Sequence, residues 1–146
     1  MRRLSLIATA CAVVLLGACT VTSATVGTSG PGTTKVASVD RDFELTVGQS
    51  AKVDGTALTI AFNGVTEESR CPVGVQCIWA GNAAVALSLT DASGAMTEAS
   101  VNTTLNPHSA RVSGYEISLV GVNPYPKQGM TIQQVSYVVT LHVTRL

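Results

Sequence analysis

Four cysteines are the residues whose type and spacing most directly suggest chemistry, and only two histidines accompany them. Cys71 and Cys77 lie six positions apart, with one proline and one glycine between them. Such a pair could form a structural disulfide, a redox-active pair, or half of a metal site. A structural zinc site needs four ligands and would have to recruit His108 and His142. The spacing also differs from the Cys-x-x-Cys of thioredoxin-like oxidoreductases.

The N-terminal residue types follow the order of a secretory signal peptide. Arg2 and Arg3 precede an uncharged apolar run, Leu4–Leu16, and small residues then lead to Cys19. The closing run Leu-Leu-Gly-Ala-Cys resembles the lipobox of bacterial lipoproteins. In that family the cysteine thiol receives a diacylglyceryl group, and the peptide is cut immediately before it. The resemblance implies a cleaved signal peptide over residues 1–18, lipidation of Cys19 by acyl chains such as palmitate, and a mature protein held to a membrane.

Two other interpretations of this segment stay open. Ala18 would also suit an ordinary signal peptide without lipidation, and an uncleaved segment would remain as an anchor. The apolar run is nevertheless shorter than the about 20 residues that a transmembrane helix needs. Thr20 stands where an Asp would resemble an inner-membrane retention signal. We therefore expect a lipid-anchored protein of the cell envelope, on the periplasmic side of the outer membrane or at the cell surface if the source has two membranes.

This location favours a disulfide between Cys71 and Cys77, because exported proteins meet an oxidising environment. Closing so small a loop contributes roughly 2 to 2.5 kcal/mol in the chain-entropy model. Cys11 lies inside the apolar run and would be discarded with the signal peptide. We therefore expect no free thiol in the mature chain.

The segment from Glu68 to Gly81 reads Glu-Ser-Arg-Cys-Pro-Val-Gly-Val-Gln-Cys-Ile-Trp-Ala-Gly. It resembles a family of small bacterial lipoproteins and exported proteins that share Asp-Ser-Arg-Cys-Pro-x-x-Val-x-Cys, then Val or Ile, then Trp-Ala-Gly. Glu68 replaces the Asp of that pattern, which keeps the charge and lengthens the side chain. The resemblance extends from Phe43 to the final strand. It supports the β fold and the disulfide, and it implies no activity.

Arg70 and Trp79 flank the predicted disulfide, and each has two interpretations. In the structural one, Trp79 covers the disulfide and packs against a sheet edge, while Arg70 pairs with Glu67 or Glu68 or donates to loop carbonyls. In the functional one, the rigid loop is a recognition surface, because Trp and Arg often carry the binding energy at interfaces. Tyr125, between two prolines, is either a half-buried crossover residue or part of a second contact loop. Arg70, Trp79 and Tyr125 are thus the candidate binding residues.

The sequence does not indicate catalysis, a metal site or nucleic-acid binding. A hydroxyl nucleophile needs a base, but His108 is typical of a turn and His142 lies on the outward face of an alternating run. No motif selects two carboxylates for glycoside hydrolysis, and no phosphate or calcium loop is present. Without Arg2 and Arg3 the chain has seven basic residues (9 − 2) against nine acidic ones, and no basic patch. We expect no enzymatic activity, no cofactor and no nucleic-acid partner.

The elements that would position these residues are short β-strands. From Phe43 onward, apolar and polar residues alternate in about seven runs, separated by turn signals such as Asp54-Gly55 and the run 91–94. No segment after the signal peptide keeps a helical period. The sequence predicts one all-β domain over residues 41–146, an antiparallel β-sandwich or small barrel. A flexible linker rich in Thr, Ser and Gly is expected over residues 19–40.

Together these observations favour a lipid-anchored envelope protein that works as a non-catalytic binding or interaction module. Its expected contacts are a membrane, through the N-terminal acyl chains, and an envelope protein or a peptidoglycan-type partner. Inhibition of a hydrolase is one version of this hypothesis, by analogy only. A passive structural envelope lipoprotein is the alternative, and an envelope hydrolase is a third, less favoured one.

Overall fold

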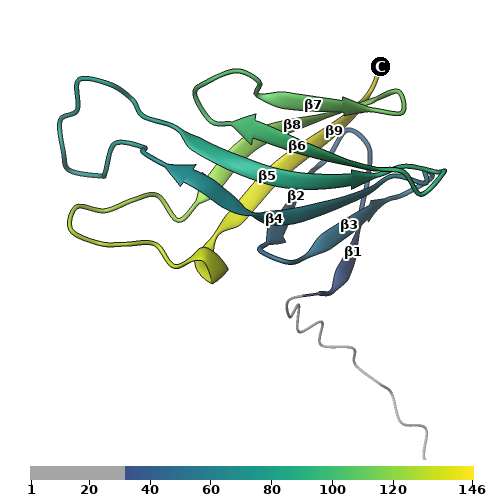
Figure 1. The fold of residues 1–146 in the computed structure, drawn as a ribbon, viewed down its shortest axis with the longest axis horizontal. Coiled ribbons are helices and arrows are strands. Elements are labelled where there is room, and N and C mark those ends of the chain that lie inside the picture. The colour runs from purple at the N-terminus through teal and green to yellow at the C-terminus, as the bar shows by residue number, and fades with distance from the viewer. Residues whose placement is uncertain (1–31) are drawn as a thin grey trace, which may run out of the picture.

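Two β-sheets packed face to face make up the described part of the protein (Figure 1). The computed structural model describes residues 32–146. Sheet A has the strand order β1-β3-β4-β5-β6, and sheet B has the order β2-β9-β8-β7. The predicted all-β sandwich is confirmed. Its strands are β1 (Thr34–Ala37), β2 (Asp42–Thr46), β3 (Ser50–Val53), β4 (Thr59–Glu68), β5 (Ala83–Thr90), β6 (Met96–Asn102), β7 (Ser109–Val112), β8 (Tyr115–Asn123) and β9 (Val138–Arg145).

The core lies between the sheets and consists of the apolar residues that alternate along the strands. Val85, Leu87 and Leu89 of β5 are fully buried, and Ile117 of β8 and Leu141 of β9 belong to the same core cluster. Removing each such side chain from water contributes about 1.5–3 kcal/mol. The alternating pattern therefore marks the strands, and burial of its apolar residues stabilises the packing of the two sheets.

The described residues form nine strands rather than about seven. The two that the sequence did not reveal are β1 and β7, each of four residues. β7 reads Ser-Ala-Arg-Val, which alternates polar and apolar residues, but the pattern extends over only four residues and none of them is fully buried. Both are edge strands held by backbone pairing to one neighbour, and backbone pairing leaves no mark on side-chain pattern.

The boundary expected at residue 41 differs from the structure. Within the stretch expected to be linker, residues 34–37 form β1 and pair in parallel with β3. Ala37 is buried and Val39 packs against the core, so these residues belong to the sandwich. The composition of this stretch hid the strand because only one of its four residues is buried. The predicted signal peptide, Cys19 and the first part of the predicted linker lie outside the described residues.

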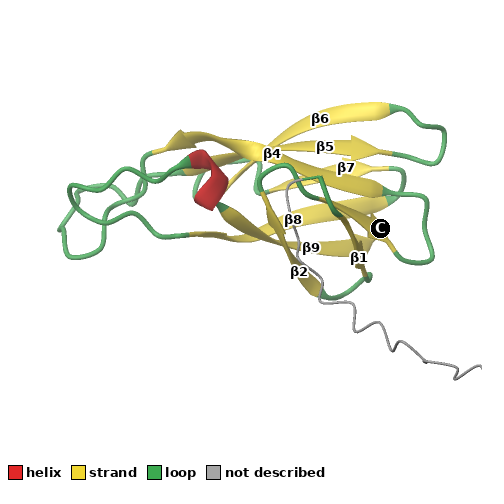
Figure 2. Ribbon diagram, turned by 90° about the horizontal axis from the view of Figure 1, so that it is seen from below, coloured by secondary structure: helices red, strands yellow, loops and turns green. Residues whose placement is uncertain are grey.

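The connections at the two ends of the sandwich differ in length. We call one the hairpin end, with the short turns 54–58, 91–95 and 113–114. The other, the loop end, carries the loops 69–82, 103–108 and 124–137, of which the last includes the short 3₁₀ helix η1 (Gln134–Ser136). In Figure 1 the loop end lies at the left, and Figure 2 shows two long loops extending beyond the strands there.

Across residues 32–146, no helix has the length and apolar character to span a membrane.

Candidate functional site at the disulfide loop

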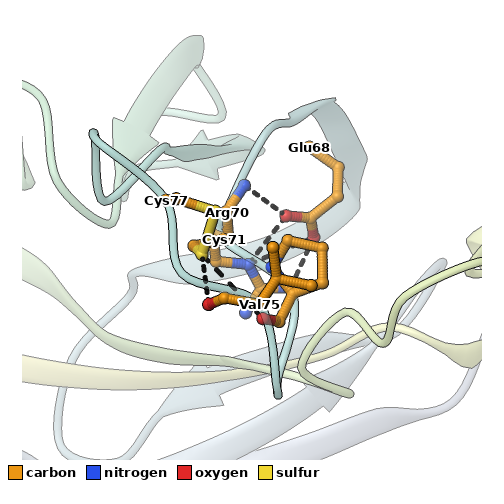
Figure 3. The surroundings of a disulfide bond; sticks show 6 residues. Glu68, Arg70, Cys71, Val75 and Cys77 are labelled. Atoms are coloured by element: carbon orange, nitrogen blue, oxygen red, sulfur yellow. Dashed lines mark hydrogen bonds and ion pairs between the residues drawn. A yellow bond between two sulfur atoms is a disulfide. The ribbon is translucent and has the colours of Figure 1, made fainter.

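Cys71 and Cys77 form a disulfide in the loop that joins β4 to β5, as predicted (Figure 3). Their Cα atoms are 5.9 Å apart. Backbone bonds close the same loop, because Cys71 N–H donates to Ala80 O at 3.0 Å and Val75 N–H donates to Pro72 O at 3.2 Å. The Cys71 sulfur lies 3.3 Å from Val75 O, and since a disulfide sulfur has no hydrogen to donate this is a close contact only. The conformation of the loop is thus fixed both by the disulfide and by backbone hydrogen bonds.

Arg70 is the centre of the loop end, and its side chain is only 5% exposed. Its guanidinium forms a two-pronged pair with Glu68, with Nε donating to Oε1 at 2.8 Å and Nη2 to Oε2 (Figure 3). The remaining donors reach Val122 O and, at 3.0 Å, Pro124 O. A fork of fixed donors suits this arrangement, because Nε, Nη1 and Nη2 each donate to an oxygen of Glu68 or of the backbone. Arg70 therefore ties the disulfide loop to the end of β8.

Tyr125 continues this connection, since the Arg70 guanidinium lies 4.9 Å from the centre of its ring. Such a cation–π contact is worth about 0.5–1 kcal/mol at an exposed site. The tyrosine is 47% exposed, and its ring lies under the Arg70 guanidinium. Val73 N–H also donates to Pro126 O at 2.9 Å. The Tyr125 loop and the disulfide loop, whose relation the sequence left open, therefore lie side by side.

The Glu68 carboxylate connects the disulfide loop to a third segment, the residues just before β9. It accepts a hydrogen bond from the Tyr137 hydroxyl at 3.1 Å, just before β9. Burial by itself raises the pKa of Glu68, but hydrogen bonds from Arg70, the Arg70 charge and the Tyr137 hydroxyl together outweigh it and lower the pKa. Burial and the Glu68 charge raise the pKa of Tyr137, so its hydroxyl stays protonated as a donor. Glu68 is thus held as the anion that Arg70 requires.

Two further polar side chains, which sequence reasoning missed, hold the loops of the loop end to the strands. The Gln134 side-chain amide donates to Val65 O and accepts from Val65 N–H at 3.2 Å, so it imitates a neighbouring strand along β4. The buried Asn82 donates to Asn102 Oδ1 at 2.8 Å and accepts from Thr104 N–H at 3.2 Å. Their partners are distant in sequence, and nothing in their local pattern distinguishes them from ordinary surface residues.

Trp79 does not cover the disulfide, contrary to the structural interpretation of that residue. Its side chain is 82% exposed, and the neighbouring Ile78 is 92% exposed. The loop backbone packs tightly at Gly81, since a Cβ on Gly81 would lie 1.8 Å from Ser69 O. Trp79 lies at the edge of a hollow that Leu105 also lines, and its indole does not fill it. Of the three candidate binding residues, Arg70 is buried, Tyr125 is half-exposed and Trp79 stands in solvent.

A hollow of about 660 Å³ lies between β4 and the loop 124–137. Glu68, Arg70, Lys127, Met130, Gln134 and Tyr137 are among its lining residues. Most of its polar side chains already bond to one another or to backbone, as described above. Lys127 differs, because no carboxylate among residues 32–146 pairs with its ammonium.

Neither histidine contacts the Arg70–Glu68 pair. His108 Nδ1 is 2.9 Å from Asn102 O, and His142 Nδ1 is 2.6 Å from the Asp42 carboxylate between β9 and β2. In the described chain, His, Cys, Asp and Glu side chains form no group of three or more that could hold a metal ion. Comparison of the sequence with protein-family models and curated proteins, and of the structure with solved structures, found no match.

Proposed function

We propose that this protein is a lipid-anchored, non-catalytic contact module of the cell envelope, and that the loop end is its contact surface. The observation that carries the proposal is the exposure of Trp79 and Ile78 on a loop stapled by a disulfide. Large apolar side chains so fully exposed on a rigid loop are unfavourable in water unless another surface covers them. Aromatic residues are also enriched at the centres of binding surfaces.

Rigidity of the loop supports the same proposal. The disulfide, the Arg70 contacts and the Asn82 contacts fix the loop before any partner arrives. A surface that is already ordered loses less conformational entropy on binding. Arg70 then acts as a positioning residue beneath the surface, because its donors are directed to Glu68 and to backbone carbonyls.

Anchoring at Cys19 forms the second part of the proposal. It is supported by the order of residue types in the first 19 residues and by the disulfide, which suits an oxidising compartment. The mass of the mature N-terminal peptide tests it. Acyl chains on Cys19 are expected, and an unmodified terminus at Ala18 or Cys19 would remove this part of the proposal.

The contact function is tested by cross-linking in intact envelopes, with the protein at its native level. We expect a reproducible contact for the wild type that is lost in the double variant Trp79→Ala, Ile78→Ala. Met96→Ala is the matched control, because Met96 is also a large exposed apolar residue, 66% exposed, at the hairpin end. Equal contacts in all three proteins would contradict the proposal and favour a passive envelope component. Arg70 is left unchanged, since its loss would disturb folding.

A further inference from the structure

Charge is nearly absent from the loops that form the loop end. The disulfide loop contains no charged residue between Cys71 and Asn82, and the loop 103–108 contains no Lys, Arg, Asp or Glu. In the loop 124–137 the only charged residue is Lys127. By contrast, the hairpin end carries Asp54 and Asp91 in its turns. Arg70 is buried and paired with Glu68, and the exposed Glu67, at the end of β4, lines a hollow together with Trp79. Beyond these residues, Lys127 is the only charge that the three loops carry, among apolar and neutral polar side chains.

Exposed apolar side chains stand on all three of these loops. They belong to Val73, Ile78 and Trp79 in the first, Leu105 in the second, and Tyr125, Met130 and Val135 in the third. A protein partner is usually met by an apolar centre with a polar or charged rim. Protruding apolar and aromatic residues beside a lysine match instead the side chains that favour the boundary between lipid headgroups and acyl chains.

We propose that the loop end docks on the interfacial region of a phospholipid bilayer. Ile78 and Trp79 enter the boundary between headgroups and acyl chains, and Lys127 contacts lipid phosphates. This inference rests on the proposed function, since it names the partner of the same contact surface. Partial entry into lipid is costly for unpaired backbone. Cys71 N–H, Val73 N–H and Val75 N–H have partners within the protein, whereas the backbone groups of Ile78 and Trp79 have none among the described residues, so only the side chains of these two residues pass beyond the hydrated headgroups.

The length of chain before the described region permits this orientation. Residues 19–31 are 13 residues and can span up to about 45 Å. Gly32 N–H donates to Gly48 O, and Gly48 N–H donates to Phe62 O, so the chain reaches the sandwich beside the middle of β4. From Phe62 to the end of β4 at Glu68 the strand advances roughly 20 Å toward the loop end. An anchored Cys19 and a docked loop end can therefore lie in the same membrane.

The single tryptophan provides the measurement, because Trp79 is the only indole in the chain. The lipoprotein is purified from membranes and reconstituted into vesicles of equal parts phosphatidylethanolamine and phosphatidylglycerol. Brominated acyl chains in these vesicles are expected to quench Trp79 emission, and aqueous iodide is expected to quench it weakly. Free quenching by iodide with none by brominated lipid would overturn the inference.

Matched variants identify the groups responsible. Ile78→Ser is expected to lower the ratio of docked to undocked protein about tenfold, because it removes one large apolar side chain from lipid. Lys127→Gln is expected to lower it about fivefold in the anionic vesicles, the contribution of one cation near such a surface. In vesicles of phosphatidylcholine alone, Lys127→Gln should have little effect. Met96→Ser, at the hairpin end, should leave the ratio unchanged; an equal loss in this variant would contradict the assignment.

Failure of the inference can be distinguished from failure of the proposed function. A photo-reactive residue in place of Ile78 is activated in native envelopes. Adducts with lipid support docking, whereas adducts with one protein overturn it and leave the contact function standing. If the native protein has an unmodified terminus and its Trp79 is still quenched by added brominated vesicles, docking is supported and anchoring alone is overturned.

Discussion

The chain reverses direction between strands at both the hairpin end and the loop end, but different hydrogen bonds stabilise the connections at the two ends. At the hairpin end the side-chain hydrogen bonds of the turns are mostly local: the Asp91 carboxylate accepts from Ser93 N–H at 2.8 Å and from Ala95 N–H at 3.2 Å, and its one distant contact is a 3.4 Å bond from the Ser113 hydroxyl. At the loop end the polar side chains bond across large sequence separations, as Arg70 does with Val122 and Pro124. A substitution should therefore disturb one turn at the hairpin end but several segments at the loop end.

The largest contrast is expected between two arginine–glutamate pairs. Arg70→Met should lower the free energy of unfolding by about 3 kcal/mol or more, because it leaves the Glu68 carboxylate partly buried without its cation. Arg111→Met removes the exposed pair with Glu116 near the turn 113–114 and should change stability far less. Urea unfolding measures both. Equal losses would show that the loop end is not organised around Arg70.

Two glycines allow the same comparison for the backbone. Gly81 and Gly94 both have positive φ, 71° and 81°. Gly94→Ala at the hairpin end meets only the left-handed backbone penalty, about 1–2 kcal/mol, since no atom lies within 4 Å of its Cβ position. Gly81→Ala adds a clash with Ser69 O and should cost about 3 kcal/mol in total. Thermal or urea unfolding of the two variants would contradict this if the two costs were the same.

Removal of the disulfide should affect the two ends unequally. The double variant Cys71→Ser, Cys77→Ser is expected to lose roughly 2 to 2.5 kcal/mol, the chain-entropy contribution of a small loop. Hydrogen exchange should accelerate in the loops 69–82 and 124–137, because they lie side by side. The turn 91–95 should exchange at its original rate. Uniform acceleration over the whole domain would indicate that the disulfide stabilises the sandwich as a unit.

Acid should weaken the loop end through Glu68. Its pKa in the folded protein is below the ordinary value of 4.5, so the stabilisation is complete above that pH and is lost as the pH falls further. Burial opposes this shift, and Arg70 and Tyr137 cause it. In unfolding measured from neutral pH to about pH 3, Glu68→Gln should be less stable at neutral pH but less dependent on pH.

The hairpin end provides the reference for this prediction. Hydrogen bonds from Ser93 are the main cause that lowers the pKa of Asp91. Because Asp91 lies at the surface and is screened by solvent, Asp91→Asn should flatten the pH dependence less than Glu68→Gln does. A larger effect of Asp91→Asn would mean that the hairpin turn, and not the loop end, controls acid stability.

The smallest effect on stability is expected for Trp79→Ser. An exposed side chain without packing partners changes stability by no more than about 0.5 kcal/mol when substituted. Met96→Ser, at the other end, should behave alike. Calorimetry that found a large loss for Trp79→Ser would restore the interpretation in which the indole packs on the domain.

The sequence predicted the sandwich because the residues of its inner faces recur at every second position, as Val85, Leu87 and Leu89 do. It predicted the disulfide because export and spacing are both local signals. It did not predict the hydrogen bond between Glu68 and Tyr137 or those between Gln134 and the Val65 backbone, since the partners in each pair are 69 residues apart. The exposure of Trp79 was missed for a related reason: whether a large side chain is covered depends on what else fills the space.

Strand β1 has a mechanical consequence. The chain passes from sheet A in β1 to sheet B in β2 and back to sheet A in β3 within residues 34–53. A pull on residues 1–31 is therefore applied first to the four paired residues of β1, of which only Ala37 is buried. We expect that under tension β1 detaches from β3 before the core strands separate, so that the chain preceding the domain lengthens while the rest of the sandwich stays folded.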